Sequence, residues 1–198
     1  YPKALKEIAC PPFVLFYHGD LNILNGKCIG VIGKRVPSEY GSSITDQIVC
    51  DLVKNEYTIV SGMALGIDTL AHRSALKNQG KTVAVLGSGI NYCYPKRNKE
   101  LYEMLKSNHL ILSEKPGDYV PQAKDFPGRN RLIAGLSESV VVTEAEKRSG
   151  TMITVGYALD QGKEIFCIPS RIGDPMGCNL LIQQGAKLVL SVSDIIED

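Results

Sequence analysis

The stretch Phe126-Pro-Gly-Arg-Asn-Arg-Leu-Ile-Ala-Gly-Leu-Ser-Glu-Ser-Val-Val-Val-Thr-Glu-Ala-Glu-Lys-Arg-Ser-Gly-Thr151 decides the expected fold. A proline and a glycine interrupt the backbone near its start, and residues 129–136 then have the pattern of a short helix. The continuous β-branched run 140–142 is typical of a strand buried on both faces of a parallel sheet. A glycine turn at 149–151 follows. The stretch therefore predicts a helix, a central strand and a phosphate-sized turn in close succession.

Two basic side chains, Arg129 and Arg131, fall in the first turn of this expected helix. A cation at a helix N-terminus opposes the helix dipole and costs roughly 0.3 to 1 kcal/mol. Two arginines in that turn are explained most simply by a bound anion. The alternative is a pair of solvated surface arginines, and spacing alone does not decide between the two.

Outward from this stretch, short apolar strands alternate with helical segments from residue 27 onward. The expected strands are 28–32, 58–60, 82–86, 110–112, 140–142, 165–168 and 188–190. The expected helices are 41–55, 67–79, 97–107, 129–136, 150–161 and 177–185. This alternation predicts one α/β domain with an extended Rossmann-like, doubly wound, mostly parallel sheet. Residues 1–26 are expected to form an N-terminal lead-in with a peripheral strand, and residues 27–198 the Rossmann-like core.

Composition sets limits on partners and compartment. The formal net charge is +1, so a nucleic-acid partner would require a local basic patch. The six cysteines form no Cys-x-x-Cys pair and the three histidines are scattered, so no metal site is expected and a reduced, cytoplasmic setting is favoured. Apolar runs are too short to span a membrane, and no leader sequence precedes Tyr1. Since Met is absent from the first position, the chain is expected to be a piece of a longer protein.

Glycine-containing turns follow five of the expected strands, at 33–41, 61–68, 87–91, 113–117 and 144–150. In an open parallel sheet such turns share the carboxyl edge, where ligands bind, and glycine lets backbone N–H groups approach an anion. Glycines that merely close tight turns are the alternative for each turn alone. Basic residues near several turns favour a phosphate-bearing ligand: Lys34, Arg35, Lys96, Arg97, Arg129 and Arg131. No dinucleotide or nucleoside-triphosphate motif is present, so no cofactor is expected.

Residues for catalysis are sparse. Asp68 and His72 lie four positions apart on one expected helix, where a structural hydrogen bond is the favoured interpretation. Glu144 follows the strand at 140–142 and would serve as a general base, or would cap the helix after it, which is the favoured role. No nucleophile, base and orienting group occur together, and the chain is not expected to be an enzyme.

Together the motifs resemble the DNA-processing protein A family (DprA, also called Smf) of bacterial natural transformation. The resemblance covers about residues 13–198. It is carried by Gly33-Lys-Arg-Val-Pro-Ser-Glu-Tyr-Gly41, Ser61-Gly-Met-Ala-Leu-Gly-Ile-Asp-Thr-Leu-Ala-His72, Ala84-Val-Leu-Gly-Ser-Gly89, Tyr94-Pro95 with Asn98, Phe126 to Ser137, Ser149-Gly150, and Gly177-Cys-Asn-Leu-Leu-Ile-Gln-Gln-Gly-Ala186. It implies a homodimer that binds single-stranded DNA, protects it and promotes loading of the RecA recombinase.

The resemblance also implies a DNA-binding pocket. Its basic residues would be Arg35, Lys96, Arg129 and Arg131, with Lys34 adding charge beside them. Ser38, Gly62, Gly89, Asn130 and Gly150 would shape the walls. Phe126 is the first choice for stacking on a base, with core packing as its alternative. Lys34 and Ser170 depart from the family pattern, where a small residue and a glycine are more usual.

Two further functions remain open. The Rossmann branch is similar to phosphoribohydrolases of the lysine-decarboxylase-like family, a nucleotide-binding enzyme type. The matching turn here, Lys147-Arg-Ser-Gly-Thr-Met-Ile-Thr154, lacks their double glycine and their catalytic glutamate. A scaffold whose turns bind nothing is the third possibility. The segment 179–186 with 188–190 is expected to form the homodimer face, or else to be ordinary core.

Overall fold

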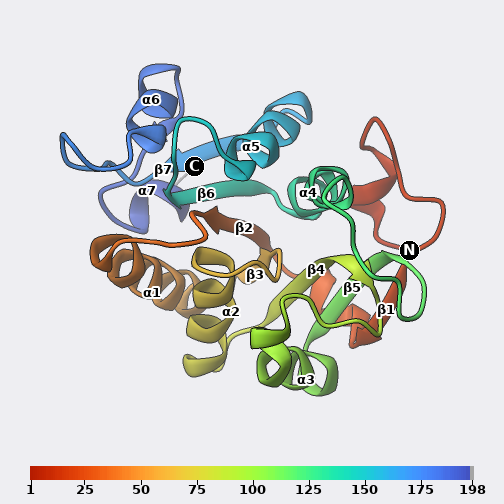
Figure 1. Ribbon diagram of the computed structural model, residues 1–198. Coiled ribbons are helices and arrows are strands. Elements are labelled where there is room, and N and C mark those ends of the chain that lie inside the picture. The colour runs from red at the N-terminus through yellow and green to blue at the C-terminus, as the bar shows by residue number, and fades with distance from the viewer. Residues whose placement is uncertain (197–198) are drawn as a thin grey trace.

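The computed structural model describes residues 1–196 as an eight-stranded sheet with helices on both faces (Figure 1). The last two positions of the expected core, 197 and 198, lie outside the described residues. The strands are β1 Phe16–Gly19, β2 Cys28–Gly33, β3 Thr58–Ser61, β4 Thr82–Gly89, β5 Leu110–Lys115, β6 Ser139–Glu144, β7 Glu164–Cys167 and β8 Lys187–Leu188. The α-helices are α1 Glu39–Lys54, α2 Ile67–Lys77, α3 Lys99–Asn108, α4 Asp125–Leu136, α5 Gly150–Asp160, α6 Gly177–Gln183 and α7 Ser193–Ile196. Short 3-10 helices are η1 Lys3–Lys6, η2 Leu21–Asn25 and η3 Lys96–Asn98.

The strand order is β1-β5-β4-β3-β2-β6-β7-β8, and only the edge pair β1–β5 is antiparallel among the described strands. The chain winds outward from β2 to β5 and then crosses back through α4 to place β6 on the other side of β2. Strand order therefore reverses between β2 and β6. In doubly wound sheets this switch point opens a crevice at the carboxyl ends of the strands. The expected fold class is confirmed.

Successive residues of each central strand contact opposite helical layers. In β6, Val140 and Val142 belong to one buried cluster with side chains of α4, α5 and α6, whereas Val141 belongs to a second cluster with α1, α2 and α7. A third cluster packs α3 against β4 and β5. Because both faces are covered, the central strands are buried along almost their whole length and most of their side chains are apolar, as in other parallel sheets.

The lead-in packs on the core. Leu5 and Ile8 are buried in the same cluster as α4, and β1 lies at the sheet edge beside β5. The division at residue 26 remains a prediction. The six cysteines are free thiols. No helix within residues 1–196 is long and apolar enough to cross a bilayer.

Helix α4 begins at Asp125, so the expected start at Arg129 is wrong. Pro127 occupies the first turn, where a missing N–H costs nothing because that turn has no intrahelical partner for it. Arg129 and Arg131 therefore lie in the second turn, and the dipole argument for an anion beside them does not hold. β4 and β5 also continue through residues 89 and 115, so two of the expected turns begin later.

Candidate nucleic-acid interface

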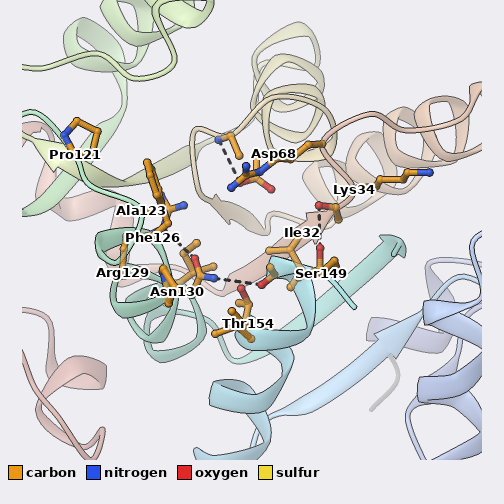
Figure 2. A pocket seen from close by; sticks show the side chains of 18 of the residues that line it. Ile32, Lys34, Asp68, Pro121, Ala123, Phe126, Arg129, Asn130, Ser149 and Thr154 are labelled. Carbon is orange, nitrogen blue, oxygen red and sulfur yellow. Dashed lines mark hydrogen bonds between the residues drawn. The ribbon is translucent and has the colours of Figure 1, made fainter. Parts of the chain in front are cut away.

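A pocket of about 640 Å³ occupies the crevice at the switch point (Figure 2). It is formed by the turn after β2, the start of α2, the first half of α4 and the start of α5. The sequence-predicted residues that line it are Lys34, Arg35, Phe126, Arg129, Asn130 and Gly150. Residues far apart in the sequence are thus brought to one place by the topology of the sheet.

The other predicted residues, Lys96, Arg131, Ser38, Gly62 and Gly89, do not line this pocket. Lys96 is exposed on η3. A Cβ at Gly89 would clash with the backbone of Gly117 and Tyr119, so that glycine lets the β5–α4 connection pass close to β4.

Arg131 points away from the pocket. Its guanidinium forms a two-pronged ion pair with Glu114 of β5, both bonds at 2.6 Å, and donates to the carbonyl of Cys10 at 2.9 Å. The carboxylate raises the pKa of this guanidinium. Arg131 therefore ties α4 to β5 and to the lead-in, a structural role that helix spacing alone did not reveal.

Arg129 is buried in the pocket wall, with 8% of its surface exposed. It donates to the carbonyl of Val85 and to Asn130 Oδ1, the latter at 3.2 Å. Burial lowers its pKa to about 10, and the nearby Asp68 carboxylate opposes that shift. A Cβ at Gly62 would lie 2.6 Å from Asp68 Oδ2 and 2.8 Å from Arg129 Nη2. Gly62 thus supports the pocket by leaving room for this pair.

Asp68 lines the pocket, although the sequence favoured a structural hydrogen bond to His72 as its role. The expected pairing with His72 is not what the structure has, because His72 Nδ1 lies 2.7 Å from Thr82 Oγ1. Asp68 lies in the wall beside Arg129 instead and accepts a long bond from Ala64 N at 3.4 Å. Burial raises its pKa to about 6 although Arg129 acts in the other direction. Its place in the turn 61–68 after β3 was the only signal in the sequence.

Lys34 and Arg35 follow β2 but differ in their ion pairs and in their exposure to solvent. Lys34 Nζ pairs with Glu146 at 2.8 Å and lies 3.8 Å from Glu144, and these contacts raise its pKa. Arg35 is exposed and lines both this pocket and a smaller one of about 90 Å³ beside it. Arg35 is therefore the more accessible cation at the pocket mouth.

Glu144 caps α1, which corrects the expectation that it caps the helix after it. Its carboxylate accepts bonds from the Ser38 N–H at 3.1 and 3.2 Å and from the Ser38 hydroxyl at 2.5 Å. Ser38 in turn is the N-cap of α1 and accepts from Gly41 N at 2.9 Å. Glu144 is only 4% exposed. Its hydrogen-bonding capacity is engaged in joining β6 to α1.

Two aromatic rings stand at the junction of the two pockets. Tyr94 and Phe126 have centroids 5.5 Å apart with planes tilted by 37°, and both line both pockets. Tyr94 is 47% exposed and Phe126 is half-buried. Phe126 is therefore neither plain core nor free surface, and one flank of the ring pair is open to a ligand.

The described residues contain no group of three or more metal-ligating side chains. Polar groups of the pocket are instead amide, hydroxyl and charged side chains. Asn130 Nδ2 donates to the Gly150 carbonyl at 3.4 Å, and Thr151 Oγ1 donates to the Gly33 carbonyl at 3.0 Å (Figure 2). These bonds join α4 to α5 and α5 to β2 around the cavity.

Fold and site define a Rossmann-like α/β protein with a pocket at the topological switch point of the sheet. The model of the family "DNA recombination-mediator protein A" matches residues 1–198. The chain belongs to this family. The family expected from the motifs is thereby confirmed, and it places the chain among proteins of DNA processing and recombination.

Individual relatives agree. The DNA processing protein DprA of Streptococcus pneumoniae is 45% identical over 200 residues, which is 100% of this chain and 71% of the relative. That of Bacillus subtilis is 41% identical over 201 residues, covering 100% and 68%. The X-ray structure of the Streptococcus pneumoniae protein superposes with a TM-score of 0.96, covering 100% of this chain and 70% of that one. A structure of DNA processing protein A from Helicobacter pylori, described for its unique single-stranded DNA binding mode, is 32% identical with a TM-score of 0.93, covering 100% and 91%.

Proposed function

We propose that this chain binds single-stranded DNA at the switch-point pocket. One observation carries the proposal: Arg35 and Arg129, from different parts of the sheet edge, line one pocket together with the ring pair Tyr94–Phe126. Proteins that hold single strands combine cations that follow the backbone with aromatic rings on which bases stack. The single-stranded DNA binding mode described for the Helicobacter pylori relative supports the proposal.

In the cell, we expect this binding to serve natural transformation. The family role implied by the motifs is to protect an incoming strand in the cytoplasm and to promote loading of RecA, with two chains acting as a homodimer. Exposed apolar side chains near the C-terminus support a self-association face, among them Leu188 and Leu190. Two pockets in a dimer would hold one strand at two points and raise its apparent affinity.

Binding without catalysis is part of the proposal. The catalytic glutamate of the related Rossmann branch is replaced by Thr154 in this chain, so Glu144 is the remaining candidate for a general base after β6. Here it accepts hydrogen bonds from the N–H and the hydroxyl of Ser38, lies 3.8 Å from Lys34 Nζ and is not among the residues that line the pocket. A base must be within reach of the proton it abstracts, and this carboxylate is held by α1.

The test compares a single strand with a duplex of the same sequence by fluorescence anisotropy. We expect tighter binding of the single strand, because bases must be unstacked to reach the aromatic rings. Arg35→Ala should weaken it by about tenfold, the effect of losing roughly 1.4 kcal/mol. Lys81→Ala is the matched control: it removes the same charge from an exposed residue just before β4, at the opposite edge of the sheet.

Equal loss in Arg35→Ala and Lys81→Ala would show that affinity comes from overall charge and not from the pocket. Preference for duplex would overturn the proposal directly. A hydrolase would release free base or phosphate from nucleotides, and this release would vanish with Glu144→Gln. Absence of such products with the parent protein is the expected result.

A further inference from the structure

Part of the pocket wall consists of buried polar side chains, and we call this part the pocket floor. It contains more polar groups than binding of a strand through its phosphates alone requires. These side chains, each at most 8% exposed, are Asp68, Arg129, Asn130, Thr151 and Thr154. Sequence-independent binding of single strands needs accessible cations and stacking rings. Buried hydrogen-bonding groups cost free energy unless they find partners, so a floor of this kind favours a ligand that offers matching polar atoms.

Most of these groups already have partners within the protein. Arg129 donates to Val85 and Asn130, and Asn130 donates to Gly150. Thr151 donates to the carbonyl of Gly33. These bonds use two of the five N–H groups of Arg129, one N–H of Asn130 and the Thr151 hydroxyl, so Arg129 keeps donors for a ligand. The same group of side chains also offers acceptor capacity.

Asp68 holds most of that capacity. An ionised carboxylate has about four acceptor sites. Among residues 1–196, the hydrogen bonds that it accepts are the long one from Ala64 N, at 3.4 Å, and one from the Ser61 side chain. Arg129 and Arg35 are the charges that face it, and both favour its ionised form. With a pKa raised to about 6 by burial, the side chain is mostly ionised at pH 7.5.

We propose that Asp68 makes the pocket selective for guanine at one position of the bound strand. Its carboxylate would accept the N1–H and the N2 amino hydrogen of a guanine turned into the pocket. Guanine is the one DNA base with two adjacent donors on its Watson–Crick edge. Adenine and cytosine present a donor beside an acceptor, and thymine places carbonyl oxygens on both sides of its single N–H. The inference rests on the proposed single-strand binding.

The size of the pocket and the residues that line it are suited to binding the edge of a base. Proteins that turn a base out of the stack read its Watson–Crick edge by hydrogen bonds and hold its face against aromatic or apolar side chains. Phe126 and Tyr94 provide such a face in the same 640 Å³ pocket whose wall contains Asp68. Arg35 at the mouth would remain available to the backbone.

A structural role is the competing explanation for Asp68. It lies in the first turn of α2, where a carboxylate is favoured by the helix dipole, and it balances the charge of Arg129. A residue with only that role would affect every oligonucleotide alike. Base identity is therefore the readout that separates the two.

The experiment uses a short oligothymidylate and its copies with one central thymine replaced by guanine, hypoxanthine or cytosine. Hypoxanthine keeps the N1–H of guanine and lacks the amino group. Competition anisotropy at pH 7.5 should rank guanine about tenfold above thymine, within the range known for bidentate base contacts, with hypoxanthine between them. Asp68→Asn should reduce the guanine advantage below about twofold, whereas Lys81→Ala should preserve it.

The parent protein supplies a second test that needs no variant. At pH 5 the Asp68 carboxyl should be mostly protonated, so the guanine advantage should shrink relative to pH 7.5. Equal affinity for guanine and thymine oligonucleotides at pH 7.5 would overturn the inference and leave the proposed function standing. A guanine advantage that persists in folded Asp68→Asn would overturn it as well. Failure of every oligonucleotide to bind would refute the proposed function itself, and the inference with it.

Discussion

At the scale of single residues, two arginines of one motif have opposite roles. Arg129 and Arg131 are two positions apart in α4, and residues so spaced point to different sides of a helix. Arg129 lines the pocket, whereas Arg131 pairs with Glu114. Sequence spacing predicted that both are near the carboxyl edge. Spacing does not indicate which way each side chain points, because the carboxylate that pairs with Arg131 is 17 positions away in β5.

Arg131→Ala should therefore act on stability first. Removing one partner of a partly buried, two-pronged ion pair leaves Glu114 uncompensated, and we expect a loss of about 2 kcal/mol in the free energy of unfolding. Urea denaturation would measure it. A double variant with Glu114→Gln should recover part of the loss. If Arg131→Ala instead leaves stability unchanged and abolishes DNA binding, the structural role assigned here is wrong.

At the scale of elements, the regular pattern was predictable and the boundaries were not. Apolar strand runs and glycine turns indicated the parallel sheet, because those features depend on neighbouring residues. The start of α4 was missed since a proline inside a first turn looks like a break. The cap of α1 was missed for another reason: Glu144 and Ser38 are 106 positions apart and meet only when β6 pairs with β2.

Packing of α2 on β4 should make stability depend on pH through His72. The side chain is fully buried, and desolvation lowers its pKa to about 3, below the value of 6.5 for the free group. The folded state therefore holds it neutral while the unfolded state protonates. Stability from this group is fully present above pH 6.5 and is lost as pH falls toward 3.

Relative to pH 8, we expect His72 to lower the free energy of unfolding by about 2 kcal/mol at pH 5. Asp68 acts with the opposite sign, because its folded pKa is raised. His72→Gln isolates the effect: urea titrations should show a smaller decrease between pH 8 and pH 5 than in the parent. An identical decrease in both proteins would assign the pH dependence to other groups, such as His109, whose pKa is also lowered by burial.

At the scale of the whole molecule, the C-terminal segment divides between core and surface. Leu181 and Val189 are buried, as expected if this segment is ordinary core. Leu188 is 43% and Leu190 79% exposed, which is what a self-association face would need. The sequence predicted an apolar segment at these positions. The structure of one chain separates its buried core residues from its exposed ones.

Leu190→Glu should convert a dimer to a monomer while the chain stays folded, because the side chain is mostly in solvent in one copy. Light scattering coupled to size exclusion, at micromolar concentration, measures the mass directly. Lys163→Ser, which changes a basic residue in the α5–β7 turn, is the control and should leave the mass unchanged. A parent protein that is monomeric under these conditions would contradict the proposed homodimer.

The pocket depends on features at all three scales: the charges of single residues, the turns at the strand ends and the topology of the sheet. The most direct test of its role is the salt dependence of single-strand affinity in the parent and in Arg35→Ala. For single strands, each neutralised phosphate contributes a slope of about −0.7 in log affinity against log salt. The parent should show a steep negative slope, and Arg35→Ala a slope shallower by about 0.7, with Lys81→Ala unchanged. A parent affinity that does not vary with salt, or a slope that Arg35→Ala leaves intact, would contradict the binding of single-stranded DNA at this pocket.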